Sequence, residues 1–260
     1  MKKRLCLILS FLLTLAAFAV PQTVLSATNV QSAEKPYFRY KLNGEQTVSV
    51  FYVDDSTCPS GEVLVIPETL DGYTVTEVYL GGSGERDKRL VLPKTVRALA
   101  GFSLYGADIT ELYLPEGLET ISYHVFHGGD SIVIPSTVTF IDQRAFGWGG
   151  TPTTLTGQTR APGTIVRTPG FTVYSDGNEV ARAYAASDGH AYVDLSEYER
   201  GDTDLNGGTD MMDAVTVLSV ASGAAYGSAV QRVMADATRD GTINMMDALA
   251  VYRTAAGAEA

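Results

Sequence analysis

Residues 202–223 read DTDLNGGTDMMDAVTVLSVASG, and residues 236–257 read DATRDGTINMMDALAVYRTAAG. The two stretches lie 34 residues apart and align without a gap, with nine of 22 positions identical. Each begins with an acidic segment that contains a central glycine, continues into small and apolar residues, and ends at another glycine. A glycine after such a run is typical of a helix C-terminus. The sequence therefore predicts a duplicated unit, an acidic loop followed by a helix.

Oxygen-bearing residues recur at matching positions of the two acidic loops. A calcium ion takes about six to eight oxygen ligands, which a loop of about twelve residues supplies from its first, third, fifth, seventh, ninth and twelfth positions, with glycine at the sixth. Gly207 and Gly241 take that sixth position. The first loop offers Asp202, Asp204, Asn206, Gly208, Asp210 and Asp213. The second offers Asp236, Thr238, Asp240, Thr242, Asn244 and Asp247. We therefore predict two bound Ca²⁺ ions; one such loop is also compatible with an ordinary acidic turn, but two in register favour calcium.

The order of loop and helix differs from that of an EF-hand, in which a helix precedes each loop. Residues 197–201 are too few and too polar for an entering helix, and the twelfth loop residue is Asp in both copies rather than Glu. A duplicated loop and helix between residues 201 and 258 resembles the type I dockerin, a small calcium-dependent module. The resemblance implies an all-α fold for this segment. It also implies a partner, a cohesin module of a scaffoldin such as that of a cellulosome.

The dockerin resemblance also implies which residues touch the cohesin. In that family the tenth and eleventh loop residues make contact, and both copies have the same pair there, a Met-Met dipeptide. Basic residues are usual further along each helix, and only the second copy keeps one. The implied contact residues are Met211, Met212, Leu218, Ser219, Met245, Met246, Tyr252 and Arg253. The duplication predicts that the helix after either loop can make the main contact with the cohesin, or lead, with one of the two orientations preferred.

Four short apolar runs, at residues 64–67, 90–93, 112–115 and 132–135, each end in proline. The prolines are 26, 22 and 20 residues apart, a period typical of leucine-rich repeats. Units of this size cannot bury their own apolar face and must share one core with their neighbours. The Ile-Pro or Leu-Pro motif, followed by Val-x-x-Ile and then Ala-Phe, resembles the BspA-type leucine-rich repeats of bacterial surface proteins.

Residues 37–195 are accordingly predicted to be the repeat domain. Residues 38–53 alternate around Asn43-Gly44, which indicates an opening hairpin, and residues 171–185 indicate a strand and a short helix that cap the array. Residues 147–170 receive no assignment. Side chains alternate along a strand, so the middle residue of each repeat strand should point outward. We expect these residues to form one exposed ladder that binds a ligand, unless a loop or the hairpin covers it. They are Val65, Val91, Tyr113 and Val133.

Residues 1–26 read as a signal peptide, because Lys2, Lys3 and Arg4 precede an apolar run that Pro21 closes. A membrane anchor needs about 20 apolar residues, and no later stretch is long enough. The chain has 19 basic and 30 acidic residues, and residues 1–26 hold three of the basic and none of the acidic ones. The remainder therefore has a net charge of 16 − 30 = −14, which argues against nucleic acid or anionic lipid as partners. We expect a secreted protein, free or attached to the cell surface through a scaffoldin.

No pattern in the sequence indicates catalysis. A glycoside hydrolase needs a facing pair of carboxylates in a cleft, and the repeats leave no room for a separate catalytic domain. His124 and His127 have a spacing at which a helix would let them share a metal, but Phe126 between them is a core position of the repeat. Trp148 is suited either to stacking on a sugar or to packing.

The sequence thus predicts an α+β protein in four parts. These are the signal peptide (1–26), a short leucine-rich repeat array of the β-solenoid kind (37–195), a linker (196–200) and a small all-α dockerin with two calcium loop-helix motifs (201–258). The predicted function is non-catalytic: calcium-dependent docking onto a cohesin, with repeats that bind a protein, a glycan or a cell surface. The alternative is an enzyme or accessory subunit of polysaccharide degradation in a cellulosome.

Overall fold

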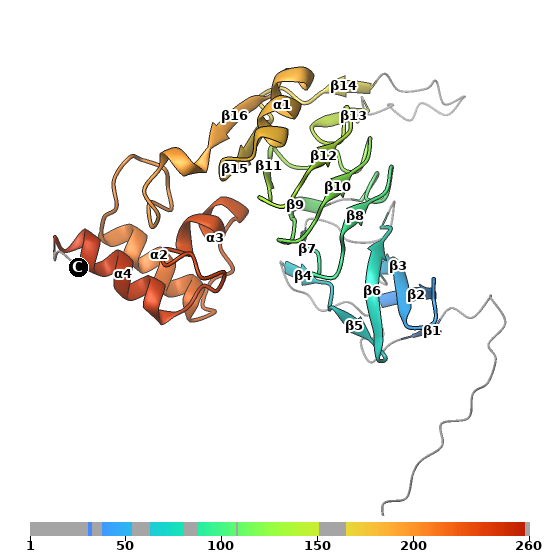
Figure 1. Cartoon of the computed structure of the whole chain (residues 1–260), viewed down its shortest axis with the longest axis horizontal. Coiled ribbons are helices and arrows are strands. Elements are labelled where there is room, and N and C mark those ends of the chain that lie inside the picture. Colours follow the sequence, from blue (N-terminus) through green and yellow to red (C-terminus); the bar gives the residue numbers. More distant parts are fainter. Residues whose placement is uncertain are drawn as a thin grey trace, which may run out of the picture.

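The computed structural model describes residues 31–32, 38–53, 63–80, 88–107, 109–150 and 165–257, which form an α+β fold of short strands followed by helices (Figure 1). The signal peptide expected over residues 1–26 lies outside this part of the chain, as do residues 151–164 of the stretch that received no assignment.

A five-stranded sheet opens the fold, in the order β1-β2-β3-β6-β5. Its strands are β1 (Gln31–Ser32), β2 (Phe38–Leu42), β3 (Thr47–Val53), β5 (Thr69–Leu70) and β6 (Tyr73–Val78). The hairpin predicted around Asn43-Gly44 is present: β2 and β3 pair antiparallel, and the Asn43 N–H donates to the Thr47 carbonyl at 3.1 Å. Strand β3 also pairs in parallel with β6, which joins the hairpin to the first repeat.

Each of the four apolar runs that end in proline contributes a strand. These strands are β4 (Val63–Val65), β7 (Lys88–Val91), β9 (Ile109–Tyr113) and β11 (Ser131–Ile134). The first three form one parallel sheet, whereas β11 pairs in parallel with β15 (Thr172–Ser175), which pairs in parallel with β16 (Ala191–Asp194). The first residue of each run is buried, as the alternation predicts: Leu64, Leu90, Leu112 and Ile132.

In the last three of these repeats the proline starts a turn that leads to a second, shorter strand. Proline has no N–H and so ends the ladder of the first strand. Its carbonyl then accepts a hydrogen bond from the residue three positions on, at 3.1 Å from Val96, 3.2 Å from Leu118 and 3.3 Å from Val138. The second strands are β8 (Ala98–Leu99), β10 (Thr120–Ile121) and β12 (Phe140–Ile141), and they pair in parallel. Successive repeats therefore turn alike and stack in register, as Figure 1 shows.

One apolar core runs through the opening sheet, the repeats and the segment that follows them. It extends from Phe38 to Ala185 and includes the fully buried rings of Phe126, Phe146 and Phe171. A short antiparallel pair, β13 (Trp148–Gly150) and β14 (Ile165–Arg167), precedes this closing segment. No single repeat could enclose these rings, so the stacked units share one interior.

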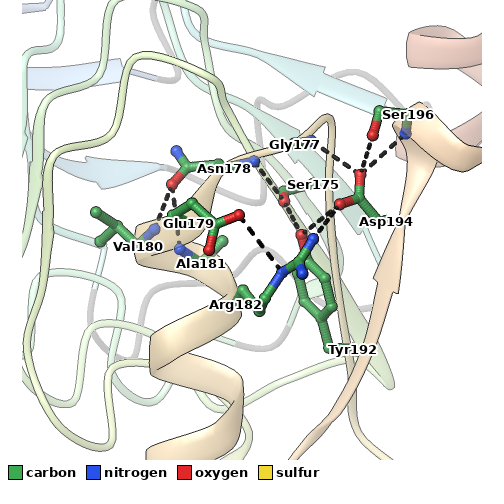
Figure 2. Close-up of polar contacts among 10 residues, drawn as sticks. All are labelled: Ser175, Gly177, Asn178, Glu179, Val180, Ala181, Arg182, Tyr192, Asp194 and Ser196. Atoms are coloured by element: carbon green, nitrogen blue, oxygen red, sulfur yellow. Dashed lines mark hydrogen bonds and ion pairs between the residues drawn. The ribbon is translucent and has the colours of Figure 1, made fainter.

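Helix α1 (Glu179–Asp188) closes the array through its N-cap residue, Asn178. The side-chain oxygen of Asn178 accepts from the backbone N–H groups of Val180 at 2.9 Å and Ala181 at 3.1 Å (Figure 2). Its amide nitrogen donates to the carbonyls of Pro135 at 2.9 Å and Val138 at 3.0 Å. The same buried side chain therefore begins the helix and ties it to the proline turn of the last repeat.

Asp194, at the end of β16, connects the cap to the segment that leaves the array. Its carboxylate accepts from the Ser196 hydroxyl at 2.7 Å, from the Gly177 N–H at 3.0 Å and from Arg182 at 2.6 Å (Figure 2). Hydrogen bonds, those from Ser196 first among them, lower the pKa of Asp194 from 3.8 to about 2. They outweigh burial, which alone would raise it. The carboxylate is thus held ionised although it is buried.

The described residues from 201 to 257 contain helices and no strand. A 3-10 turn, η1 (Leu195–Glu197), leads into α2 (Met211–Ala221), α3 (Ala229–Ala235) and α4 (Met245–Ala255). A separate small core joins these helices, made of Ala214, Val217, Ala235, Ala248 and Val251. The helix expected after each acidic loop is present, as α2 and α4.

The segment expected as a linker, residues 196–200, is held from both sides. Arg200 forms an ion pair with Asp176, which lies between β15 and α1. Arg200 also donates to the carbonyl of Val233 in α3. Its neighbour Gly201 donates to the carbonyl of Met234 at 2.9 Å. These contacts attach the helical segment to the cap of the array.

The double role of Asn178 yields a prediction that capping preferences alone would not give. Asp and Asn cap helices about equally well, so Asn178→Asp should be nearly neutral if capping were the sole role. Asp cannot donate to the carbonyls of Pro135 and Val138, and we expect a loss of about 1–3 kcal/mol in the free energy of unfolding. Urea unfolding of the full chain measures it. If Asn178→Asp proves as stable as the wild type, the contacts to the last repeat contribute little.

Asp194 should make the stability of the repeat domain depend on pH. Because the pKa of this group is lower in the folded chain than its ordinary value of 3.8, its stabilisation is present above that value and is lost as the pH falls towards about 2. Asp194→Asn should therefore lower the melting temperature at neutral pH. The gap to the wild type should close between these two pH values. The exposed Asp130→Asn is the control, and an unchanging gap for Asp194→Asn would contradict this account.

Candidate functional site

The first acidic loop is organised by Asp202, which lies at its start and is buried. One carboxylate oxygen accepts from the Asn206 N–H at 3.2 Å and the other from the Gly207 N–H at 2.9 Å. The exposed Asp204 accepts from the same Asn206 N–H at 3.1 Å. Gly207 has φ of 94°, a conformation that glycine adopts without steric cost. The loop therefore curls around its own acidic side chains.

The last loop residue, Asp213, lies in the first turn of α2. One of its oxygens accepts from the backbone and the hydroxyl of Thr203, both at 2.8 Å, and the other accepts from the Asp210 N–H at 2.9 Å. The Asp210 side chain in turn caps α2 by accepting from Met212 at 2.6 Å. Asp213 is therefore at once a loop residue and part of the helix capping box.

Three carboxylates meet in this loop. Oxygens of Asp202, Asp204 and Asp213 lie within 4.8 Å of one another, and no lysine or arginine in the described part of the chain forms an ion pair with them. Burial raises the pKa of Asp202 above its ordinary value, and the charge of Asp213 adds to the rise. A cation would relieve this repulsion, and an all-oxygen donor set suits a hard ion such as Ca²⁺. The residues present therefore fit the predicted metal.

The second loop repeats the design with one carboxylate fewer. Asp236 accepts from Asp240 at 3.1 Å and Gly241 at 3.0 Å, as Asp202 does from the matching residues. Asp247 accepts from the Thr238 backbone and hydroxyl at 2.9 Å each and from the Asn244 N–H at 2.8 Å. Burial acts to raise the pKa of Asp247, but these hydrogen bonds outweigh it and the pKa is lowered. Thr238 stands at the third loop position, where the first loop has Asp204, and its hydroxyl bonds to Asp247.

The remaining predicted ligands lie along the same two loops. The side chain of Asn206 accepts from the Gly208 N–H at 3.0 Å, and that of Asp240 accepts from the Thr242 N–H at 2.8 Å. Asn244 caps α4 by accepting from Met246 at 2.7 Å, matching Asp210 in α2. The ninth residue of each loop thus uses one side-chain oxygen to cap the helix that follows.

Helices α2 and α4 pack on each other through equivalent residues. The matched positions 213/247, 214/248 and 217/251 are buried in both helices. Each helix therefore presents the same face to the other, the internal analogue of an isologous contact between two subunits.

Each of these two helices also leaves an apolar stripe exposed, at the same positions in both copies. We call these the outer stripes: Met211, Met212, Val215 and Leu218 on α2, and Met245, Met246, Leu249 and Tyr252 on α4. Met212 is 68% exposed and Met246 is 61% exposed. Val215 and Leu249 were not predicted, although their spacing of four from the first methionine places them on the same helix face. Arg253 is exposed and Ser219 half-buried beside the stripes.

The exposed ladder expected on the repeat strands is interrupted, which corrects that prediction. Val65, Val91 and Tyr113 do align across β4, β7 and β9, but Val133 lies on β11, outside that sheet. Val65 is 44% exposed and Val91 and Val133 are half-buried, whereas Tyr113 is only 7% exposed. The four side chains therefore do not form one open surface.

The helical segment is what covers Tyr113. The Tyr113 hydroxyl lies 2.7 Å from the Gly227 carbonyl and 2.7 Å from the Glu111 carboxylate, and its ring meets that of Tyr226 edge-on at 5.2 Å. Glu111 also accepts from the Ala229 N–H, at the start of α3, at 2.7 Å. No local feature of the sequence indicates that the turn before α3 contacts the repeat sheet, because such a contact depends on how the two parts meet.

The histidine pair and Trp148 serve packing. His124 stacks on Phe102 with ring centroids 5.6 Å apart, and His127 meets Tyr105 edge-on at 4.5 Å. Burial lowers the pKa of both imidazoles. Trp148 donates to Asp188 at 3.0 Å and lies under the Arg144 guanidinium.

One groove of about 390 Å³ lies along β6 and β8, and among the described residues that line it Glu77 is its single carboxylate. The facing pair required for glycoside hydrolysis is therefore not formed there. No helix within the described residues is both long and apolar enough to cross a membrane.

Comparison with known proteins adds little. No protein-family model and no curated protein matches this chain. Among solved structures it is similar to a leucine-rich repeat protein from Bacteroides ovatus, at 20% sequence identity and a TM-score of 0.29. The match covers 42% of this chain and 37% of that protein, so this chain spans well under two thirds of its length. A likeness this slight carries no argument about family or activity.

The two loops should differ in affinity for calcium. The first offers one more carboxylate, and an added ligand charge contributes on the order of 1 kcal/mol or more, about fivefold in affinity. Titration calorimetry of the full chain should therefore show that Asp202→Ala removes the tighter of two binding events and Asp236→Ala the weaker. The reverse order would show that loop geometry outweighs ligand charge.

Proposed function

We propose that residues 201–258 form a calcium-dependent docking module of the dockerin type, which attaches the repeat array to a cohesin module of a scaffoldin. The chain is then a secreted, non-catalytic interaction protein of the leucine-rich repeat class, either free or held at the cell surface by its scaffoldin. The observation that carries the proposal is the pairing, twice over, of an acidic loop with an exposed apolar stripe on the helix that follows it.

Calcium and docking are coupled through the start of each helix. Asp213 and Asp247 are predicted ligands, and each lies directly after a methionine pair and inside the first turn of α2 or α4. An ion held by these carboxylates would fix the first turn and with it the direction of the methionines. Ion binding of this kind adds to folding stability, which a module with so small a core needs.

The outer stripes are suited to an apolar partner surface. Methionine is flexible and polarisable, and it fits an adaptable contact. Both stripes stay exposed although the turn at Tyr226 and Gly227 lies against the repeat sheet. Either helix is therefore free to lead, and the packing of α2 and α4 through equivalent residues means that half a rotation exchanges them.

The two docking orientations should differ in strength. The stripes match at the methionines but differ further along, where Leu218 and Ser219 in α2 correspond to Tyr252 and Arg253 in α4. The second set adds a ring and a positive charge, both of which are common in interface hot spots. We therefore infer that the orientation led by α4 is preferred.

Docking should survive the loss of either methionine pair but not of both. Full-length variants Met211→Ala/Met212→Ala and Met245→Ala/Met246→Ala should each retain binding to a responsive cohesin, within about tenfold of the wild type, and the fourfold variant should lose it. Binding is measured by surface plasmon resonance against a panel of scaffoldin cohesins, in calcium and in EDTA. Ile165→Ala/Val166→Ala, an exposed apolar pair on β14, is the matched control.

Three outcomes would overturn parts of this proposal. Loss of binding with a single pair would mean one docking orientation. Binding that persists in EDTA would separate the contact from calcium. Failure of every cohesin in the panel to bind the wild type would remove the dockerin assignment.

A further inference from the structure

Five aromatic side chains gather at the edge of the array where the second strands end. We call them the ring cluster: Phe102, Tyr105, Tyr123, His124 and His127. Phe102 and His124 occupy the same position of two successive repeats, nine residues after Pro93 and Pro115, and their rings stack with planes only 4° apart. Tyr105 and His127 are likewise equivalent, twelve residues after the same prolines. Repetition of the turn has therefore built a ladder of rings along the edge.

The outermost rings are exposed and yet fixed. Phe102 is 47% exposed and Tyr123 is 45% exposed, and their centroids lie 5.0 Å apart in an edge-to-face contact. Beneath Tyr123 lies Gly101, where even a methyl group would come within 3.0 Å of the ring. His124, which is buried, supports Phe102 from below. A preorganised aromatic platform loses little conformational entropy when a ligand covers it.

A groove with both polar and apolar lining residues adjoins this platform. The groove of about 390 Å³ is lined by Ala100 and Ser122, which lie two residues before Phe102 and one before Tyr123. Its wall carries the half-exposed ring of Tyr79 together with Glu77, Thr95 and Arg97. The small residues Ala98 and Ala100 also line it. Figure 1 shows β6, β8 and β10, which carry this surface, side by side.

We propose that the ring cluster and this groove form a binding site for a neutral polysaccharide. A sugar ring has an apolar face of C–H groups and a rim of hydroxyls. The rings of Phe102 and Tyr123 suit the face, and the mixed donors and acceptors of the groove suit the rim. Residues 27–260 have 16 basic and 30 acidic residues, a net charge of −14, which disfavours an acidic polysaccharide. This inference names the ligand class of the repeats and rests on the proposed function only in treating them as the ligand-binding part.

A protein partner or a second copy of the chain is the competing occupant. Such an interface is usually a broad patch with an apolar centre. Here the exposed rings adjoin a groove whose lining includes a carboxylate, a guanidinium and hydroxyl groups, so the surface has no continuous apolar centre. A narrow chain of hydroxylated rings meets these groups and the aromatic faces together.

The test is native affinity electrophoresis of the full chain, in calcium, through gels that contain soluble β-glucan, xyloglucan, xylan or galactomannan. The wild type should be retarded in at least one gel. Phe102→Ala and Tyr123→Ala should each weaken binding about three- to tenfold, and the double variant should migrate freely. Tyr123→Phe keeps the ring and should bind as the wild type does. The control Phe51→Ala removes an exposed ring from β3, outside the ring cluster and the groove, and should leave the retardation unchanged.

Cohesin binding, measured on the same proteins, separates this inference from the proposed function. Tyr123→Ala should bind cohesin normally, and the fourfold methionine variant should bind the polysaccharide normally. If Phe102→Ala lowers the melting temperature, Tyr123→Ala and the groove variant Tyr79→Ala test the site instead. The inference is overturned if the wild type runs unretarded in every gel, or if the double variant is retarded as strongly as the wild type. A dimer that dissociates in the double variant, seen by light scattering, would assign the platform to self-association and overturn it as well.

Discussion

Every unit in this chain is too small to enclose a core by itself, and it must pair with another unit to fold. In the array, successive repeats form the same proline turn, at Pro93, Pro115 and Pro135, and neighbouring repeats enclose the interior together. In the helical segment the same constraint acts on two loop-helix units. Val217 and Val251 are buried in one small core that α2 and α4 share with Ala235.

Pairing of like units decides which surfaces remain for function. Residues at the shared face are used up by packing, and equivalent residues on the opposite face stay open in every copy. The outer stripes on α2 and α4 arise in this way. Duplication thus places the same kind of exposed surface on each copy.

The two parts of the chain meet at polar and aromatic contacts rather than through a merged core. Tyr113 and Glu111 bind the turn and the first residues of α3, and Arg200 joins the cap to the same helix. These contacts use no residue of either outer stripe or of the ring cluster. The proposed docking and polysaccharide surfaces therefore remain accessible at the same time, as a protein that connects a scaffold to a glycan would require.

Local and periodic features were determined by the sequence itself. The glycines at 207 and 241, the proline period and the Asn43-Gly44 turn act over a few residues, and the structure has the loops, strands and hairpin they predicted. Side-chain alternation correctly put Leu64 and Leu90 in the core. It also pointed Tyr113 outward, but whether an outward residue meets solvent depends on what packs there.

Only the tertiary structure decided that Tyr113 is covered, that Asn178 links the cap to the last repeat, and that rings from two repeats form one platform. Each of these features joins residues that are separated by one repeat or more along the chain. Their distance in space is set by the stacking of whole units, and local preferences along the chain do not encode which side chains then meet.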